Sequence, residues 1–309
     1  MAQAQSAPIS QPPPHAELVK TAETEAVWSE TADRLKWRLD VARKSTFFLS
    51  ILGAVLATLA SQKSGDLRQF LAIFGAAPLG LASFITAQFL GSAQVTGWVR
   101  ARAASEALKR EAWSCAAGGG AYQDFPQRDA RLRIERERIE RDVDDLIGLT
   151  VTAPRAHSAI PQTVVSRGQY IDQRVHDQID RYYLPRAEQH GKVSSALRWL
   201  ELSLSMFAAL VAAAIGFAGK EAFGSIDFIA FTAVLTTIGG AIVAHVEASR
   251  YDFLVATYRA TARRLKNELV TNANFVSMSD AEWAAFVQRC ETIIADQNGS
   301  WLSKWTRAS

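Results

Sequence analysis

The residues that could do chemistry are few and scattered in this chain. Its five histidines are isolated from one another: His15, His157, His176, His190 and His245. Its two cysteines, Cys115 and Cys290, have no metal-type spacing, and no His/Cys/carboxylate set has the spacing of metal ligands. No Gly-x-Ser-x-Gly, phosphate-binding lysine loop or kinase signature occurs. The sequence therefore predicts no enzyme, no metal site and no cofactor.

One cluster of titratable residues does occur around His176, with Asp172, Asp177 and Asp180 on the same predicted helix. A binding site is one interpretation of this cluster. A solvated helix face is the preferred one, because runs of charge on a helix are usually solvent-exposed.

Charge-free segments dominate the chain in place of catalytic motifs. In the second half, Leu202 to Gly219 and Phe228 to Val246 are 18 and 19 residues long and are bounded by charged residues. As helices they would be roughly 27–29 Å long, close to the thickness of the bilayer hydrocarbon. Buried helices of a soluble protein are the alternative. A charge at the bilayer centre costs about 2.5–3.5 kcal/mol, so long runs without any charge favour membrane helices.

The first half repeats this arrangement. Ser45 to Gln62 is charge-free, and a second run from Gln69 to Val99 is longer than one span requires. We therefore predict an all-α integral membrane protein with four spans, at about residues 45–62, 70–92, 200–219 and 227–246. The spans would form two tandem helical hairpins with long cytosolic helical extensions.

The domain organisation follows from this repeat. Residues 1–24 are predicted to be a disordered tail, because they lack a continuous apolar core and contain Pro12-Pro13-Pro14. The tail does not have the form of a cleavable signal peptide. We predict a first two-span domain over 25–150, a linker over 151–168 flanked by Pro154 and Pro161, and a second two-span domain over 169–305.

Basic residues gather on one side of the predicted hairpins. They cluster in 34–44, 100–110, 181–198 and 250–266, whereas the opposite side has only Lys63, Arg68 and Lys220. The positive-inside rule then places both termini and the central segment in the cytoplasm of a multi-pass protein. A net charge of +3 gives no electrostatic support for nucleic-acid binding, so the lipid bilayer is the predicted partner.

Small residues and one proline interrupt two of the spans. Gly75, Pro78 and Gly80 lie in the second span, and Gly239 and Gly240 lie in the fourth. Proline removes one backbone hydrogen bond and favours a kink, so these residues could form a hinge or a bend in a pore. Small residues also allow helices to approach closely, and ordinary helix packing is the preferred interpretation.

Polar residues within the fourth span are candidates for lining a pore. Thr232, Thr236 and Thr237 could face an aqueous path, or they could bond to the backbone of their own helix. His245 is an ionisable group at the predicted cytosolic edge of the span. A polar residue at the edge of the bilayer costs little free energy, so its presence there needs no functional explanation. A role in proton or ion passage is therefore the less favoured alternative.

The two halves are related by a parallel internal repeat. At an offset of 157 residues, Arg102 corresponds to Arg259 and Lys109 corresponds to Lys266. Few residues are identical between the two halves. The evidence for the repeat is the shared order of helix, span, short loop, span and helix. Both copies enter the membrane in the same direction, unlike the inverted repeats of many transporters.

This order of elements resembles the SLATT superfamily of bacterial two-span effector domains. The second half carries the best match, in the approach helix Tyr170–Tyr183, the hairpin, the helix Arg259–Glu268 and the ending Phe286–Ile294 with Trp301. The first half resembles a diverged member, so the chain resembles two tandem copies over about 25–305.

The resemblance implies a membrane effector of a prokaryotic conflict or defence system in the bacterial inner membrane. Such an effector would act as a homo-oligomer that perforates or depolarises the membrane, in response to a cytosolic sensor or nucleotide-signal partner. Four spans enclose too little space for a wide channel, so several chains would be needed. The alternative is a non-enzymatic membrane scaffold that presents a cytosolic helical platform to a partner protein.

Overall fold

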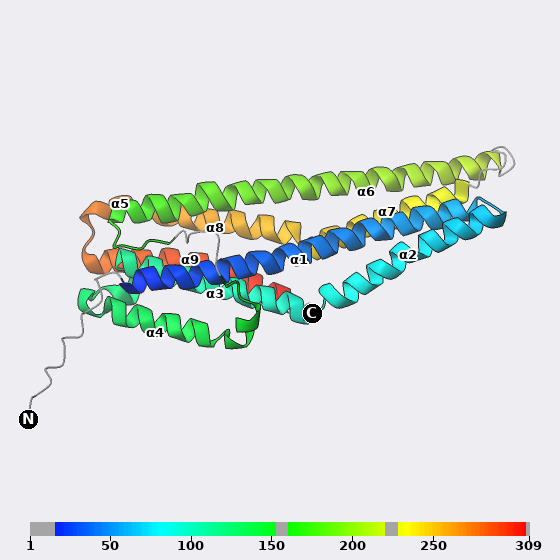
Figure 1. The fold of residues 1–309 in the computed structure, drawn as a ribbon. Coiled ribbons are helices and arrows are strands. Elements are labelled where there is room, and N and C mark those ends of the chain that lie inside the picture. Colours follow the sequence, from blue (N-terminus) through cyan, green and yellow to red (C-terminus); the bar gives the residue numbers. More distant parts are fainter. Residues whose placement is uncertain (1–15, 153–159, 220–227, 307–309) are drawn as a thin grey trace, which may run out of the picture. The chain divides into compact units, whose positions relative to one another are not determined.

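A computed structural model describes residues 16–152, 160–219 and 228–306, and every regular element in these residues is helical (Figure 1). The longer helices are α1 (Ala16–Ser61), α2 (Gly65–Phe89), α3 (Ser92–Ala117), α4 (Arg128–Arg141), α6 (Leu184–Ala218), α7 (Phe228–Ser249), α8 (Tyr251–Thr271) and α9 (Asp280–Thr306). A short α5 (Arg167–Tyr170) leads into a π-helix, η4 (Ile171–Tyr183). Short 3₁₀ helices are η1 (Gly120–Tyr122), η2 (Phe125–Gln127), η3 (Asp144–Leu149) and η6 (Phe275–Ser277). The all-α, membrane-type fold predicted from the sequence is confirmed.

The helices form two compact units that are not consecutive along the chain. Unit 1 takes its described residues from Met1–Asp33, Trp98–Ile179 and Arg263–Lys304. Unit 2 takes them from Arg34–Gly97, Asp180–Ala262 and Trp305–Ser309, and holds the four apolar stretches. Each unit therefore draws on both predicted halves of the sequence, so the repeats are interleaved within each unit.

The start of α1 corrects the predicted N-terminal tail. The helix begins at Ala16, so residues 16–24 are helical and the prediction of disorder is wrong for them, while residues 1–15 lie outside the described part of the chain. Leu18 and Ala22 are buried, and the Thr21 hydroxyl donates to the Glu17 carbonyl oxygen at 2.7 Å. Leu18 and Ala22 are four residues apart and therefore lie on one face of the helix, which packs against the core. The composition of the segment alone did not reveal this face.

The two copies share a pattern of continuous and broken helices. The first and third apolar stretches belong to uninterrupted helical runs, Ala16–Ser61 and Arg167–Ala218. The second and fourth are each followed by a break: at Leu90–Gly91 between α2 and α3, and at Arg250 between α7 and α8. Arg250 has φ 52°, a left-handed conformation that costs a non-glycine residue about 1–2 kcal/mol. Breaks at corresponding positions are consistent with a duplicated unit.

The core of unit 1 collects apolar side chains from all its long helices. Its largest fully buried residues include Leu18, Leu108, Leu132, Ile179, Leu265 and Phe286. An aromatic cluster joins α3, α5 and α9, because the Tyr170 ring lies 6.1 Å from the Trp113 ring and 5.7 Å from the Trp283 ring. The Trp283 indole N–H donates to the Ala117 carbonyl oxygen at 2.8 Å. Burying each such side chain contributes about 1.5–3 kcal/mol.

The π-helix η4 follows from a strict four-residue repeat. Its buried apolar positions are Ile171, Val175, Ile179 and Tyr183. An α-helix has about 3.6 residues per turn, so positions spaced by four would drift around it. A helix with a wider turn aligns positions that are four and five residues apart, and Tyr170, Arg174, Ile179 and Tyr183 have these spacings and are all buried. The π-helix is rare and occurs mostly as single-turn bulges, so this run of 13 residues is a distinctive feature of the second copy.

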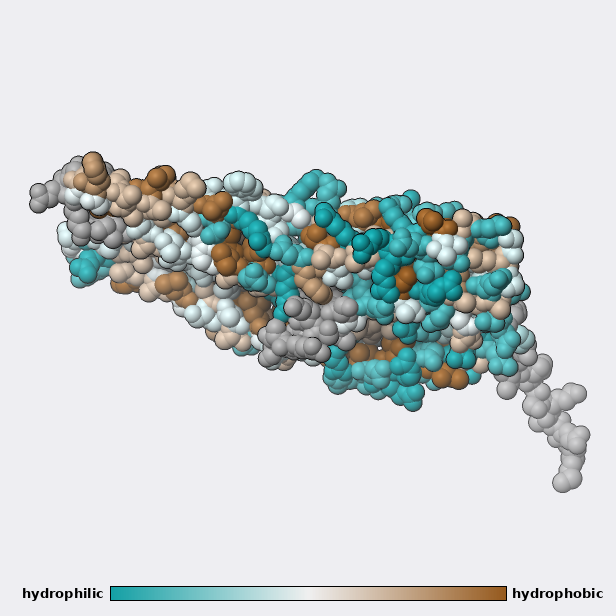
Figure 2. Space-filling model, turned by 180° about the vertical axis from the view of Figure 1, so that it is seen from behind, coloured by the Kyte–Doolittle hydropathy of each residue, from teal (hydrophilic) through white to brown (hydrophobic). Residues whose placement is uncertain are grey.

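Unit 2 contains two hairpins, α1 with α2 and α6 with α7 (Figure 1), and the apolar stretches of these hairpins are mostly exposed. On the face drawn in Figure 2, pale and brown residues cover these helices, whereas hydrophilic residues cover much of unit 1. Large exposed side chains on the hairpins include Phe70, Ile73, Phe84, Met206, Phe207 and Leu210. At most 17% of the residues in any of the four apolar windows are buried, so the helices require an apolar environment outside the chain.

Candidate functional site

The membrane helices pack closely at Gly75, one of the predicted hinge or packing residues. A Cβ atom at Gly75 would lie 3.1 Å from the backbone nitrogen of Ala57 and 3.3 Å from Cβ of Leu56, both on α1. The facing residue Gly53, which the sequence interpretation missed, is equally confined, because its Cβ would lie 2.6 Å from Cγ of Leu79. The two glycines allow α1 and α2 to approach each other closely.

The other predicted hinge or packing residues lie in more open positions. Helix α2 is continuous through Pro78, which is half-buried, and a Cβ at Gly80 would meet open space. Gly239 is buried, and its Cβ would be 3.8 Å from the Ser205 hydroxyl on α6. Gly240 is exposed with open space around it. Of the five predicted hinge or packing residues, Gly75 is therefore the one that lies close against the backbone of a neighbouring helix.

The predicted pore-lining threonines hydrogen-bond within α7. The Thr236 hydroxyl donates to the Thr232 carbonyl oxygen at 2.8 Å, and the Thr237 hydroxyl donates to the Ala233 carbonyl oxygen at 2.8 Å. Both hydroxyl-bearing residues are exposed on the isolated chain, and Thr232 is half-buried. This geometry corresponds to the second of the two sequence interpretations. A pore-lining role for the three residues stays a prediction.

His245 lies among aromatic rings of unit 2. Its ring is 5.2 Å from that of Phe47 on α1 and 6.4 Å from that of Tyr251 at the start of α8. The side chain is half-buried, and α7 ends four residues later at Ser249. These contacts give His245 a packing role, and its proposed part in ion passage stays a prediction.

A buried ion pair between η4 and α9 is the strongest polar feature of unit 1. The Arg174 guanidinium donates to both oxygens of Glu291, at 2.9 and 2.8 Å. The side chains of Arg174 and Glu291 are only 4% and 0% exposed. Tyr170 donates to the same carboxylate at 3.1 Å, and the guanidinium lies 5.7 Å from the Trp113 ring centre. Burial alone would lower the pKa of Arg174, but the Glu291 carboxylate holds it above its ordinary value.

Sequence reasoning assigned no role to this pair, although a signal was present. Arg174 lies four residues after Tyr170 and next to Val175, so it borders the apolar face of its helix. Glu291 lies likewise among Cys290, Ile293 and Ile294 on the apolar face of α9. A charge on a buried face requires a partner, since an unpaired buried charge is strongly unfavourable.

The two cysteines are free and buried, and neither has the surroundings of a reactive nucleophile. Burial raises the pKa of Cys115 to about 12 and also raises the pKa of Cys290. The thiolate is the reactive form, so both thiols are inert near neutral pH. Within the described residues, no group of three or more His, Cys, Asp or Glu residues could hold a metal ion.

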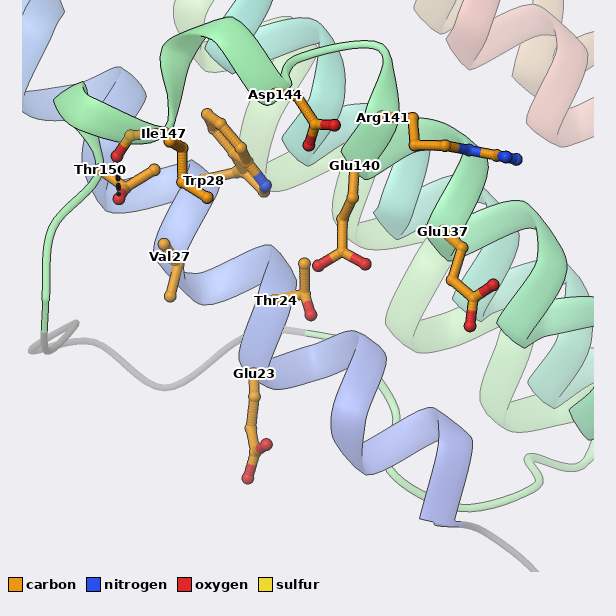
Figure 3. Close-up of a pocket in the computed structure, with 10 residues that line it drawn as sticks. All are labelled: Glu23, Thr24, Val27, Trp28, Glu137, Glu140, Arg141, Asp144, Ile147 and Thr150. Atoms are coloured by element: carbon orange, nitrogen blue, oxygen red, sulfur yellow. Dashed lines mark hydrogen bonds between the residues drawn. The ribbon is translucent and has the colours of Figure 1, made fainter.

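An open groove of 680 Å³ lies on unit 1 between α1 and the α4–η3 segment (Figure 3). We call it the acidic groove, because four carboxylates and only one guanidinium line it: Glu23, Glu137, Glu140, Asp144 and Arg141. Trp28, which is 5% exposed, and Ile147, which is 69% exposed, add apolar surface. The groove therefore suits a cationic and partly apolar group. It would repel an anionic phosphate.

Two known protein families match segments of the chain. Residues 170–301 match the family described as "SMODS and SLOG-associating 2TM effector domain 1". Residues 26–130 match a family described as "Protein of unknown function (DUF4231)", which is a SLATT-like domain. No curated protein and no solved structure matches the chain.

The matched segments contain the features described above. The first segment includes the α1–α2 hairpin with Gly53 and Gly75, and the second includes the α6–α7 hairpin. Arg174 and Glu291 both lie within the second match. The acidic groove extends beyond the first match, since Glu137, Glu140 and Asp144 follow residue 130.

Proposed function

Because the chain belongs to the SMODS and SLOG-associating two-span effector family over residues 170–301, and carries a SLATT-like domain over 26–130, we propose that it is a membrane effector of a prokaryotic conflict or defence system. Its action would be to perforate or depolarise the bacterial inner membrane. The proposal assigns it no catalytic step.

The observation that carries the proposal is the exposure of four apolar helices in one chain. They are long and apolar enough to cross a bilayer, and their apolar windows are almost unburied by the chain itself. Lipid and further copies of the chain are the environments that would cover such surfaces. Four spans enclose too little space for a wide aqueous path, so the active form would be a homo-oligomer.

The proposed orientation places both termini in the cytoplasm. It is supported by the basic residues around 34–44 and 250–266, against only Lys63, Arg68 and Lys220 on the opposite side. Alkaline phosphatase fused to either terminus is therefore expected to be inactive in bacteria. The same enzyme inserted after Lys63 should be active, and active terminal fusions would contradict the proposed orientation.

The partner that triggers the effector would be a cytosolic sensor or a protein that makes a nucleotide signal. The charged helices of unit 1 offer a surface on which such a partner could act. A phosphate-bearing ligand would not bind in the acidic groove, because its carboxylates would repel the phosphates.

Membrane perforation is tested by releasing a dye from liposomes that contain the full chain. We expect leakage to rise more steeply than in proportion to the protein-to-lipid ratio, because assembly from several copies depends on concentration. Expression in bacteria should also depolarise the membrane and arrest growth.

Liposomes prepared with an unrelated four-span protein serve as the control for leakage. Liposomes that stay tight at every ratio, together with polarised membranes in cells that express the chain, would overturn the proposal. That outcome would favour the alternative function, a membrane scaffold whose charged helices bind a partner protein.

A further inference from the structure

We propose that the acidic groove of unit 1 receives the opposite flank of α4 from a second copy of the chain. This inference rests on the proposed function for its use, since a perforating effector must assemble from several copies. It adds the surface through which they would meet outside the apolar helices.

The groove presents acidic and apolar chemistry together. Asp144 and Glu137 are exposed, and Ile147 beside them is 69% exposed. In Figure 3 Glu140 extends from α4 toward α1, while Trp28 lies against the η3 segment that carries Asp144 and Ile147. The buried Arg136 guanidinium lies 2.7 Å from the Glu140 carboxylate and 3.9 Å from that of Glu137, so the acidic excess of the groove lies with Glu23 and Asp144. The exposed Ile147 beside Asp144 adds apolar surface that a partner could cover. The groove suits a partner that is both cationic and apolar.

The complementary surface lies on the other flank of α4. We call it the basic ridge and define it by Arg131 and Ile134, which lie three residues apart and are both exposed, Ile134 by 59%. Arg131 is nine residues before Glu140, which is two and a half turns at about 3.6 residues per turn, so the two point to opposite sides of the helix. Helix α4 therefore carries the groove residue Glu140 on one side and Arg131 on the opposite side, while the apolar residues of the groove, Trp28 and Ile147, come from α1 and η3.

Charge complementarity favours a second copy as the occupant. Each chain brings both surfaces, so the ridge of one copy can fill the groove of the next. Such a contact is heterologous, and it generates a ring when the rotation between copies closes. A ring is the arrangement that a membrane-perforating assembly needs. A free nucleotide would be repelled by the carboxylates of the groove.

Charge reversal on each surface tests the proposal in the detergent-solubilised full chain. Arg131→Glu and Asp144→Arg are each expected to shift sedimentation toward smaller species. The apparent dissociation constant should rise at least about 30-fold, since like charges in contact cost several kcal/mol. Arg131 and Asp144 are both exposed, so the fold should survive either change.

Restoration separates a direct contact from a general charge effect. The double variant Arg131→Glu/Asp144→Arg should assemble like the unmodified chain, because a basic groove then meets an acidic ridge. An equimolar mixture of the two single variants should also assemble, with the copies alternating. Arg263→Glu is the matched control, because Arg263 is exposed on the same unit and belongs to neither surface, and it should leave assembly unchanged.

The apolar part of the contact has its own variants. Ile134→Ser and Ile147→Ser should each weaken assembly without lowering thermal stability, because both side chains are largely exposed in the single chain.

Assembly of both charge variants at unmodified strength would overturn the proposed contact, as would a double variant that fails to recover or a chain that never assembles. If the contact fails while liposomes still leak, the copies meet elsewhere and the effector function stands. If the charge reversals behave as expected while liposomes stay tight, the contact stands and the perforating function falls.

Discussion

Replacing Glu291 by leucine is expected to destabilise unit 1 by about 3–5 kcal/mol, because it leaves the buried Arg174 guanidinium without its carboxylate. The loss includes two charge-assisted hydrogen bonds from Arg174 and one hydrogen bond from the Tyr170 hydroxyl. Urea unfolding of the detergent-solubilised chain measures it. Tryptophan fluorescence is a suitable probe, because Trp113 and Trp283 both lie against Tyr170.

An exposed ion pair on the same helix gives the matched control. Arg289 bonds to Glu268 at 2.9 Å, but the two side chains are 47% and 24% exposed. Replacing Arg289 by alanine should cost no more than about 1 kcal/mol, since exposed pairs contribute little. An equal effect of the two variants would show that the Arg174–Glu291 pair does not hold η4 against α9.

The double variant Arg174→Leu/Glu291→Leu extends this argument. It removes both charges together, so no uncompensated charge remains in the core. We expect it to recover most of the stability lost by Glu291→Leu, because replacing a whole buried pair by apolar residues is often close to neutral. Stability alone would then not account for the pair. The double variant therefore tests whether the Arg174–Glu291 pair fixes the register of η4 against α9.

Much of the membrane fold could be predicted because its physical signal is local. A charge is costly within a bilayer, so the segments bounded by Lys44 and Lys63 or by Glu201 and Lys220 mark their own extent in the sequence. The helices agree closely with these limits, with α1 ending at Ser61 and α6 ending at Ala218. Helix α2 differs more, since it ends at Phe89 whereas the predicted span reached residue 92.

The helix breaks and the division into units depend on contacts that the sequence does not display. Gly91 marks the first break with a residue of low helix propensity, but Arg250 adopts a left-handed conformation without any such signal. The interleaving of the two copies arises from pairings over long sequence separations, such as Arg174 with Glu291 and Trp283 with Ala117. A repeat recognised along the chain therefore identified the copies without showing how each unit combines them.

Site residues could be predicted from the sequence only where the residue type itself restricts the structure, as glycine does at a close helix contact. Gly75 was predicted to allow close helix packing, and its surroundings on α1 are tight. Gly80, five residues along the same helix, satisfied the same criterion and meets open space. Spacing alone did not tell them apart, because the direction of approach of α1 is a tertiary property.

This difference supplies the second large expected effect. Gly75→Leu should destabilise the α1–α2 hairpin by about 1–3 kcal/mol, since its side chain would be forced against the backbone at Ala57, which cannot move aside as a flexible side chain could. Unfolding in SDS, followed by circular dichroism in mixed micelles, measures the loss. The variant should also slow the leakage of dye-filled liposomes if the hairpin must keep its close contact in the active assembly.

Gly80→Leu is the control on the same helix. It adds the same apolar side chain and the same helix propensity, but its Cβ would meet nothing within 4 Å. Its stability should stay within about 0.5 kcal/mol of the unmodified chain. If the two leucine variants unfold alike, the effect belongs to the propensity of α2 and not to its contact with α1. If the Gly80→Leu variant is folded but no longer makes liposomes leak, the open face at Gly80 contacts lipid or a second copy in the active assembly. An added side chain there would then alter assembly without altering the fold.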